Sequence, residues 1–86
     1  MIIKKDLILR KIGSDVILIP VGNTVKDHNG FFMLTESASF LWENIAECDS
    51  VEELAHKLYD EYDVTEEDAL ADTKEFIDKL TELGII

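Results

Sequence analysis

The sequence contains one cysteine, Cys48, and two histidines, His28 and His56, among its 86 residues. A single thiol cannot build a disulfide framework, and the two histidines have no metal-ligand spacing, so we expect no metal site. No glycine-rich phosphate loop and no convergent set of nucleophile, acid and base accompanies them. The sequence therefore predicts a protein that is not an enzyme, with no catalytic residues and no cofactor.

Long hydrophobic runs are also absent. No apolar stretch approaches the roughly 20 residues that span a bilayer. Lys4, Lys5 and Asp6 interrupt the N-terminus before the apolar core of a signal peptide could form. We therefore expect a cytoplasmic protein with no membrane partner.

Basic side chains are scarce, with 8 Lys and Arg against 19 Asp and Glu, a net charge of −11. The charge is uneven, because residues 1–34 carry a net +2 and residues 35–86 a net −13. An acidic half repels phosphate, so we expect no nucleic-acid partner. This acidity is typical of a solubilising surface, and the alternative is that it steers a basic partner.

What the chain does contain is enough apolar residues, 47%, for one core in a single domain over residues 1–86. In the first third, residues 7–12 are typical of an extended segment that is partly apolar on both sides, and residues 16–19 form a β-branched run. Between them lies the turn-forming sequence Gly13-Ser14-Asp15, and Pro20 closes the second run. This pattern predicts a β-hairpin.

A third strand is predicted at residues 31–34, where the uninterrupted apolar run Phe-Phe-Met-Leu suits a strand buried on both faces. Ahead of it, Thr24-Val25-Lys26 predicts a further short strand, and Asn29-Gly30 predicts a tight turn. The side chains of a strand alternate between its faces. Either Phe32 and Leu34 or Phe31 and Met33 must therefore point inward.

From residue 35 onward the periodicity becomes helical, and three helices are predicted at about 36–47, from 51 and at about 66–83. Thr35, Ser50 and Thr65 are their expected N-caps, Ser50 in a capping box with Glu53, and Gly84 is the expected C-cap of the last helix. The expected inner stripes are Ala38, Leu41, Trp42 and Ile45; then Val51, Leu54, Ala55, Leu58 and Tyr62; then Leu70, Thr73, Ile77 and Leu80, with Ala69, Phe76 and Leu83 along one edge.

The order of elements predicts an α+β fold, in which a small N-terminal antiparallel three-stranded sheet is followed by three helices in a winged-helix-like arrangement. If residues 31–34 form an edge strand, an extended peptide could add beside them by β-augmentation. The same edge could pair two copies into a homodimer. Whether Phe76 belongs to the core or to a binding groove stays open at this stage.

Several short motifs, in a fixed order from about Leu7 to Ile86, resemble one family. They are Val16-Ile17-Leu18-Ile19-Pro20, Asn29-Gly30, Leu34-Thr35-Glu36-Ser37-Ala38 with Leu41-Trp42, Ser50-Val51-Glu52-Glu53-Leu54, Tyr62-Asp63-Val64, and Asp72, Phe76, Leu80 and Leu83-Gly84-Ile85. The chain resembles the pyrroloquinoline-quinone biosynthesis protein D (PqqD) family, whose fold is the recognition element for ribosomally made, modified peptides. One departure is that the family's Leu-Asn-Glu-Thr-Ala has Thr35 and Ser37 here, which keeps the capping chemistry.

The resemblance implies a non-catalytic protein that holds the leader of a precursor peptide and presents it to a modifying enzyme, typically a radical S-adenosylmethionine enzyme. The leader would lie between the third strand and the third helix. Carried over by position, the peptide-binding residues are Phe31, Phe32, Met33 and Leu34 on one side and Ala69, Asp72, Thr73 and Phe76 on the other. The identities of the client peptide, the enzyme and the product stay open.

Two other functions compete with this one. A winged-helix DNA-binding or regulatory module fits the order of elements. However, the third helix carries Lys74 and Lys79 against seven acidic residues, which would repel a duplex. The other alternative is a module that docks onto a partner protein without binding a peptide.

Overall fold

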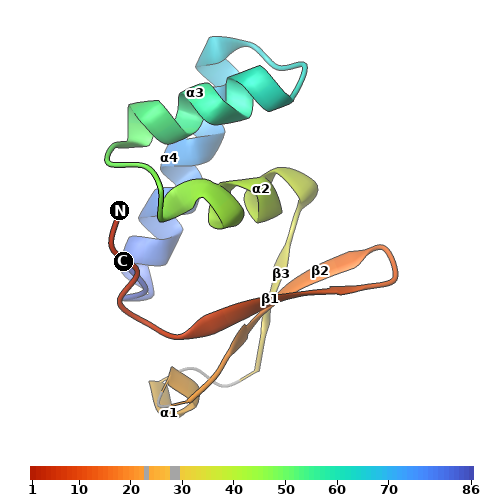
Figure 1. Cartoon of the computed structure of the whole chain (residues 1–86), viewed down its shortest axis with the longest axis vertical. Helices are drawn as coiled ribbons and strands as arrows, with labels where there is room; N and C mark the ends of the chain where they lie inside the picture. The colour runs from red at the N-terminus through yellow and green to blue at the C-terminus, as the bar shows by residue number, and fades with distance from the viewer. Residues whose placement is uncertain (23, 28–29) are drawn as a thin grey trace.

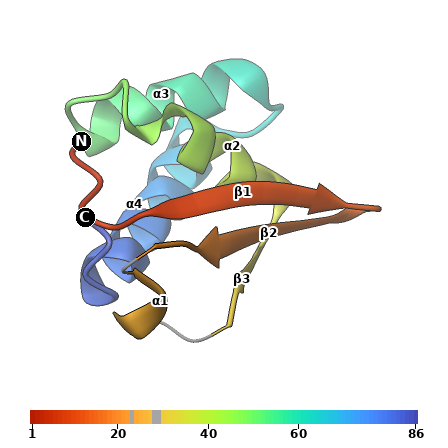
Figure 2. The same ribbon diagram turned by 60° about the horizontal axis from the view of Figure 1, so that its bottom comes forward.

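The computed structural model describes residues 1–22, 24–27 and 30–86. Its elements are β1 (Leu7–Ile12), β2 (Asp15–Pro20), α1 (Thr24–Asp27), β3 (Phe32–Leu34), α2 (Glu36–Ile45), α3 (Val51–Glu61) and α4 (Glu66–Glu82). The three long helices lie together on one side of the sheet, as Figures 1 and 2 show. This arrangement confirms the expected α+β fold. None of the helices in the described part of the chain is long and apolar enough to cross a membrane.

The sheet has the order β1-β2-β3 and both pairings are antiparallel. The hairpin of β1 and β2 is confirmed, and its turn contains Gly13 at φ +62°, a conformation that glycine adopts without strain. Leu18 in the central strand pairs with Leu9 on one side and Phe32 on the other. β3 is therefore an edge strand, as the binding hypothesis requires.

The expectation that the third strand is buried on both faces is wrong. Phe31 and Met33 are 58% and 63% exposed, whereas Phe32 and Leu34 are half-buried. The helices cover only one face of the sheet, so only alternate side chains of β3 reach the core. The sequence left open which pair of side chains faces the core, and in the structure Phe32 and Leu34 point inward.

The short strand expected at Thr24-Val25-Lys26 is also wrong, because these residues begin helix α1. Gly22, at φ +59°, turns the chain out of the sheet directly after β2. The buried Thr24 then accepts a hydrogen bond from the backbone N–H of Asp6 through its Oγ1 at 2.8 Å, instead of pairing in a ladder. Asn29 of the expected Asn29-Gly30 turn lies outside the described residues.

The three expected N-caps are confirmed. The hydroxyl oxygens of Thr35, Ser50 and Thr65 accept hydrogen bonds from backbone N–H groups three residues later, at 3.0–3.1 Å. At the far end of α4, Gly84 adopts φ +75°, which returns Ile85 into the core. Capping therefore sets the helix boundaries to within two residues of those expected.

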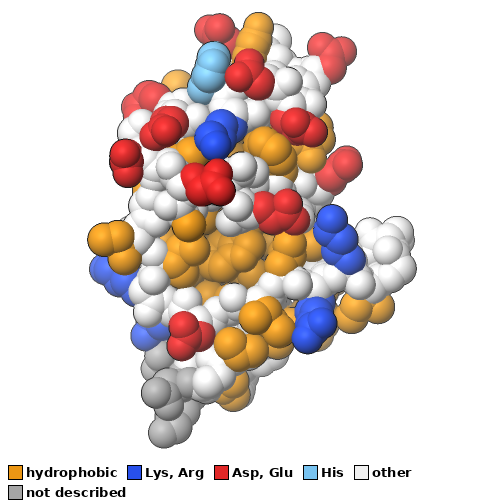
Figure 3. All heavy atoms as spheres, viewed as in Figure 1, with side chains coloured by type: hydrophobic (Ala, Val, Ile, Leu, Met, Phe, Trp, Pro, Cys, Tyr) orange, Lys and Arg blue, Asp and Glu red, His pale blue; other side chains and the backbone are white. Residues whose placement is uncertain are grey.

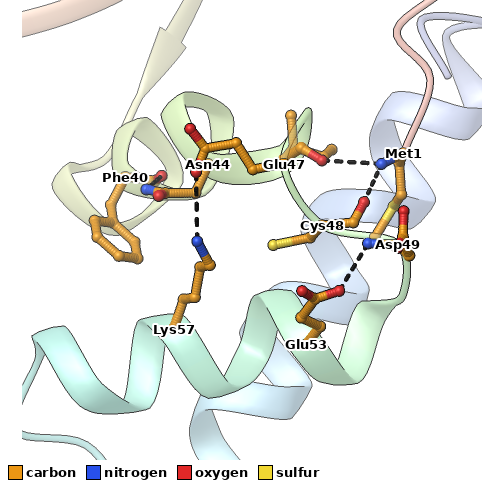
Figure 4. Close-up of polar contacts among 9 residues, drawn as sticks. Met1, Phe40, Asn44, Glu47, Cys48, Asp49, Glu53 and Lys57 are labelled. Atoms are coloured by element: carbon orange, nitrogen blue, oxygen red, sulfur yellow. Dashed lines mark hydrogen bonds and ion pairs between the residues drawn. The ribbon is translucent and has the colours of Figure 1, made fainter.

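The connection between α2 and α3 is held by several polar contacts (Figure 4). The amino group of Met1 donates to the backbone carbonyls of Ile45 and Cys48 at the end of α2. The expected capping box pairs the Glu53 side chain with the backbone N–H of the N-cap Ser50. In the structure, Glu53 Oε2 instead accepts from the backbone N–H of Asp49 at 2.8 Å, one residue before the N-cap. These contacts hold the N-terminus against the connection and cap the start of α3, and α2 and α3 both pack against α4.

The core lies where the helices meet one another and the inner face of the sheet. Leu41, Ile45, Leu54 and Leu58 are buried, as the stripes of the first two helices predict. The stripe predicted for the last helix is wrong at one position, because Leu70 is 37% exposed. The residues that α4 buries are Ala69, Thr73, Ile77 and Leu80.

Candidate functional site

A hollow of about 720 Å³ opens between the edge strand β3 and helix α4. Its base is apolar and is made of Leu18 from β2, Leu41 from α2, Leu80 from α4 and Ile85 from the C-terminal segment. Its other lining residues are Phe31, Phe32, Met33, Leu34, Thr35, Ser37, Ala38, Asp72, Glu75, Phe76, Lys79 and Leu83. We call this hollow the β3–α4 groove.

The strand wall of the groove follows from the position of β3 at the end of the sheet. An edge strand can pair with a further chain through its main-chain groups. Phe32 and Leu34 point into the groove from this strand, and Phe31 and Met33 form its exposed rim. The wall thus combines a strand edge with aromatic and aliphatic surface.

The helix wall comes from one face of α4. Asp72, Glu75, Phe76, Lys79 and Leu83 recur at i, i+3, i+4, i+7 and i+11, which places them along a single stripe. This stripe lies beside the buried one, so α4 serves the core with one face and the groove with the adjacent face. Phe76 does both, because it is half-buried, packs against the core and lines the groove.

The two ends of the groove can be told apart. The backbone N–H of Lys4 donates to the carbonyl of Ile85 at 2.6 Å, which places the chain end beside the start of β1. This end of the sheet is nearer to Phe32 than to Leu34 in the strand register. Helix α4 therefore runs in the opposite direction to β3, as Figures 1 and 2 both show, and Asp72 lies toward the Leu34 end.

Six of the eight expected binding residues line this groove: Phe31, Phe32, Met33, Leu34, Asp72 and Phe76. Ala69 and Thr73 do not, because both are buried in the core. The sequence prediction missed Glu75, Lys79 and Leu83, although they share the helical period of Asp72 and Phe76. It also missed Thr35, Ser37 and Ala38, because the N-terminal turn of α2 reaches the groove only through the tertiary fold.

The residues that line the groove are suited to binding a partner through surface contact. The described residues contain no group of three or more His, Cys, Asp and Glu side chains placed to hold a metal ion. Cys48 does not line the groove, and burial raises the pKa of its thiol. An apolar hollow beside an edge strand suits an extended peptide, which would pair its backbone with β3 and place alternate side chains in the hollow.

Charge is segregated over the molecule. Figure 3 shows most acidic side chains over the helices, most Lys and Arg side chains near the sheet, and an apolar hollow between α2 and β1 on the face in view. The sequence half that contains the helices carries the net −13. A partner of the helical layer therefore meets a strongly negative surface.

Comparison with known proteins gives one family and one solved structure. The family described as coenzyme PQQ synthesis protein D (PqqD) matches residues 16–86. The structure of TbiB1 in complex with the TbiA(beta) leader peptide has a TM-score of 0.72 and 22% sequence identity, and the match covers 99% of this chain and 93% of that chain. Among curated proteins, no sequence matches the chain.

Proposed function

Since the chain belongs to the PqqD family, we propose that it is a non-catalytic protein that binds the leader of a ribosomally made precursor peptide. The leader adds as a strand beside β3 and lies in the β3–α4 groove. The protein then presents the peptide to a modifying enzyme, of the radical S-adenosylmethionine class, in the cytoplasm.

The observation that carries this proposal is the β3–α4 groove itself. It joins an edge strand, which supplies main-chain pairing, to an apolar hollow, which supplies side-chain pockets. The fold similarity to TbiB1 supports it, because TbiB1 is a protein of the same architecture in complex with a leader peptide. Family membership points the same way.

We assign peptide contact to Phe31, Phe32, Met33 and Leu34 on the strand wall. On the helix wall we assign it to Asp72, Glu75, Phe76, Lys79 and Leu83. Ala69 and Thr73 are left out because their side chains are buried. The winged-helix alternative gains no support, because an exposed surface of α4 dominated by carboxylates would repel DNA phosphates.

The test is a titration of the 15N-labelled protein with a synthetic leader peptide, taken from a precursor encoded beside its gene. We expect amide shifts concentrated at residues 31–34 and 72–83. Phe76→Ser should abolish these shifts, and Leu70→Ser should not, because Leu70 lies on the same helix outside the groove. Circular dichroism is measured on both variants, and Phe76→Ser tests the groove only if it keeps the helical spectrum of the original chain.

Shifts confined to other surfaces would contradict the assignment of the groove. Binding of the modifying enzyme without binding of any peptide would favour a simple docking module instead. Because the edge of β3 could also pair two copies, sedimentation is measured with and without peptide. If a homodimer uses this edge, the peptide should dissociate it.

A further inference from the structure

The helix wall of the β3–α4 groove carries charge as well as apolar surface. Asp72, Glu75 and Lys79 are all exposed, and all three line the groove. Within the described residues, none of them forms an ion pair. The two carboxylates and one ammonium group give this wall a net charge of −1.

The two carboxylates lie toward one end of the groove. Asp72 and Lys79 are seven residues apart, about 10 Å along a helix axis. Because α4 runs opposite to β3, the carboxylates lie toward Leu34 and Lys79 lies toward Phe32. An extended peptide of about three residues covers the same distance, so it meets the acidic end and Lys79 with different side chains.

The apolar anchor of the groove lies directly beside the acidic end. Asp72 is one helical turn before Phe76, and Glu75 is the i+3 neighbour of Asp72, so a peptide side chain that packs on the Phe76 ring lies beside Asp72 and can reach Glu75 if it is long. A long side chain with an aliphatic stem and a cationic head satisfies both surfaces at once. Lys and Arg have this form.

We propose that the groove selects peptides in which a Lys or Arg side chain lies next to an apolar anchor, with its cation held by Asp72 and Glu75 at the Leu34 end. The inference rests on the proposed function and adds the chemical class of the client. It holds for either direction of the bound strand, because the acidic end belongs to the groove and not to the peptide.

The expected effect is modest. Exposed ion pairs contribute about 0.2–1 kcal/mol each, so two carboxylates correspond to a change in affinity of about 2- to 30-fold. The apolar hollow supplies the larger part of the binding, and the charges discriminate among peptides that already fit it. The preference should weaken as salt is added, because these side chains are solvent-exposed.

The test needs no knowledge of the client. A displayed library of random twelve-residue peptides is selected on the immobilised full chain. We expect enrichment of apolar residues and, next to them, of Lys and Arg relative to the starting library. The double variant Asp72→Asn/Glu75→Gln should lose the basic enrichment and keep the apolar one.

A matched control separates the groove from the overall charge. Glu61→Gln/Asp63→Asn removes the same two charges at exposed positions that do not line the groove. It should retain the basic enrichment. Replacing the enriched Lys by Gln in a selected peptide should then weaken binding 2- to 30-fold to the original chain and leave binding to Asp72→Asn/Glu75→Gln unchanged.

Each result decides between the two proposals. Apolar enrichment without basic enrichment, or equal loss of basic enrichment in both double variants, overturns the charge preference and leaves the peptide-binding function intact. No enrichment of any kind overturns the peptide-binding function, and the charge preference falls with it.

Discussion

Replacing Thr73 by valine should stabilise the fold. The Thr73 side chain is 0% exposed, and its Oγ1 has no hydrogen-bond partner among the described residues. A buried polar group without a partner costs about 1–3 kcal/mol. Valine has nearly the same shape and similar helix propensity, so the change removes this cost without leaving a cavity. Taking the lower end, we expect a gain of about 1 kcal/mol, or about 4–8 °C in Tm for a domain of this size.

The assay is urea unfolding followed by circular dichroism, with the slope m compared between variants to confirm that only stability changes. Thr81→Val is the control on the same helix, because its hydroxyl is already bonded to the carbonyl of Ile77 at 2.9 Å. Its exposed position predicts a change within about 0.5 kcal/mol. A loss of stability in Thr73→Val would refute the reasoning, since it would show that the hydroxyl has a partner. Peptide affinity should not change, because Thr73 does not line the groove.

Two further predictions concern the strand rim and the buried thiol. Met33→Thr should weaken peptide binding several-fold in a fluorescence titration, because a strand added beside β3 covers Met33. Ile12→Thr is the control and should not weaken binding, because Ile12 lies on β1 at the opposite edge of the sheet. The two side chains are almost equally exposed, Ile12 at 61% and Met33 at 63%. Cys48 should react with a disulfide reagent far more slowly in the folded protein than in guanidinium, because it is fully buried and burial raises the pKa of its thiol. The same raised pKa means that the folded state favours the protonated thiol, so the free energy of unfolding should fall as the pH rises above about 8.5, and Cys48→Ala should reduce this slope.

The sequence predicted the helices well because their signals are local. Each N-cap hydroxyl lies three residues before the N–H that it accepts from, so Thr35, Ser50 and Thr65 could be identified without tertiary information. The hairpin was predictable for the same reason, since its turn joins two strands that pair with each other. The sequence leaves the edge position of β3 as a condition of the binding hypothesis, and the sheet order establishes it.

The predictions that were wrong concern residues whose burial or secondary structure is determined by tertiary packing. Ala69 and Leu70 are adjacent apolar residues, and helical periodicity allows either one to face the core. Packing of α4 on α3 selects the smaller one, Ala69, and leaves Leu70 exposed. Thr24 and Val25 have strand propensity, but the bond from Asp6 to the Thr24 hydroxyl fixes a helical turn instead. Thr73 was assigned to the groove because the face of α4 that meets it could not be placed without the sheet.

The two edges of the sheet differ in a way that explains why a peptide would add beside β3 and not beside β1. The β1 edge carries the exposed charges of Arg10 and Lys11, a common means of preventing unwanted strand pairing. The β3 edge contains no charged residue, and it borders an apolar hollow that continues to α4. A strand added at β3 would gain main-chain bonds and would also bury its inward side chains against Phe76 and Leu80. Charge therefore protects the β1 edge against pairing, whereas the uncharged β3 edge borders the β3–α4 groove and can accept a peptide strand.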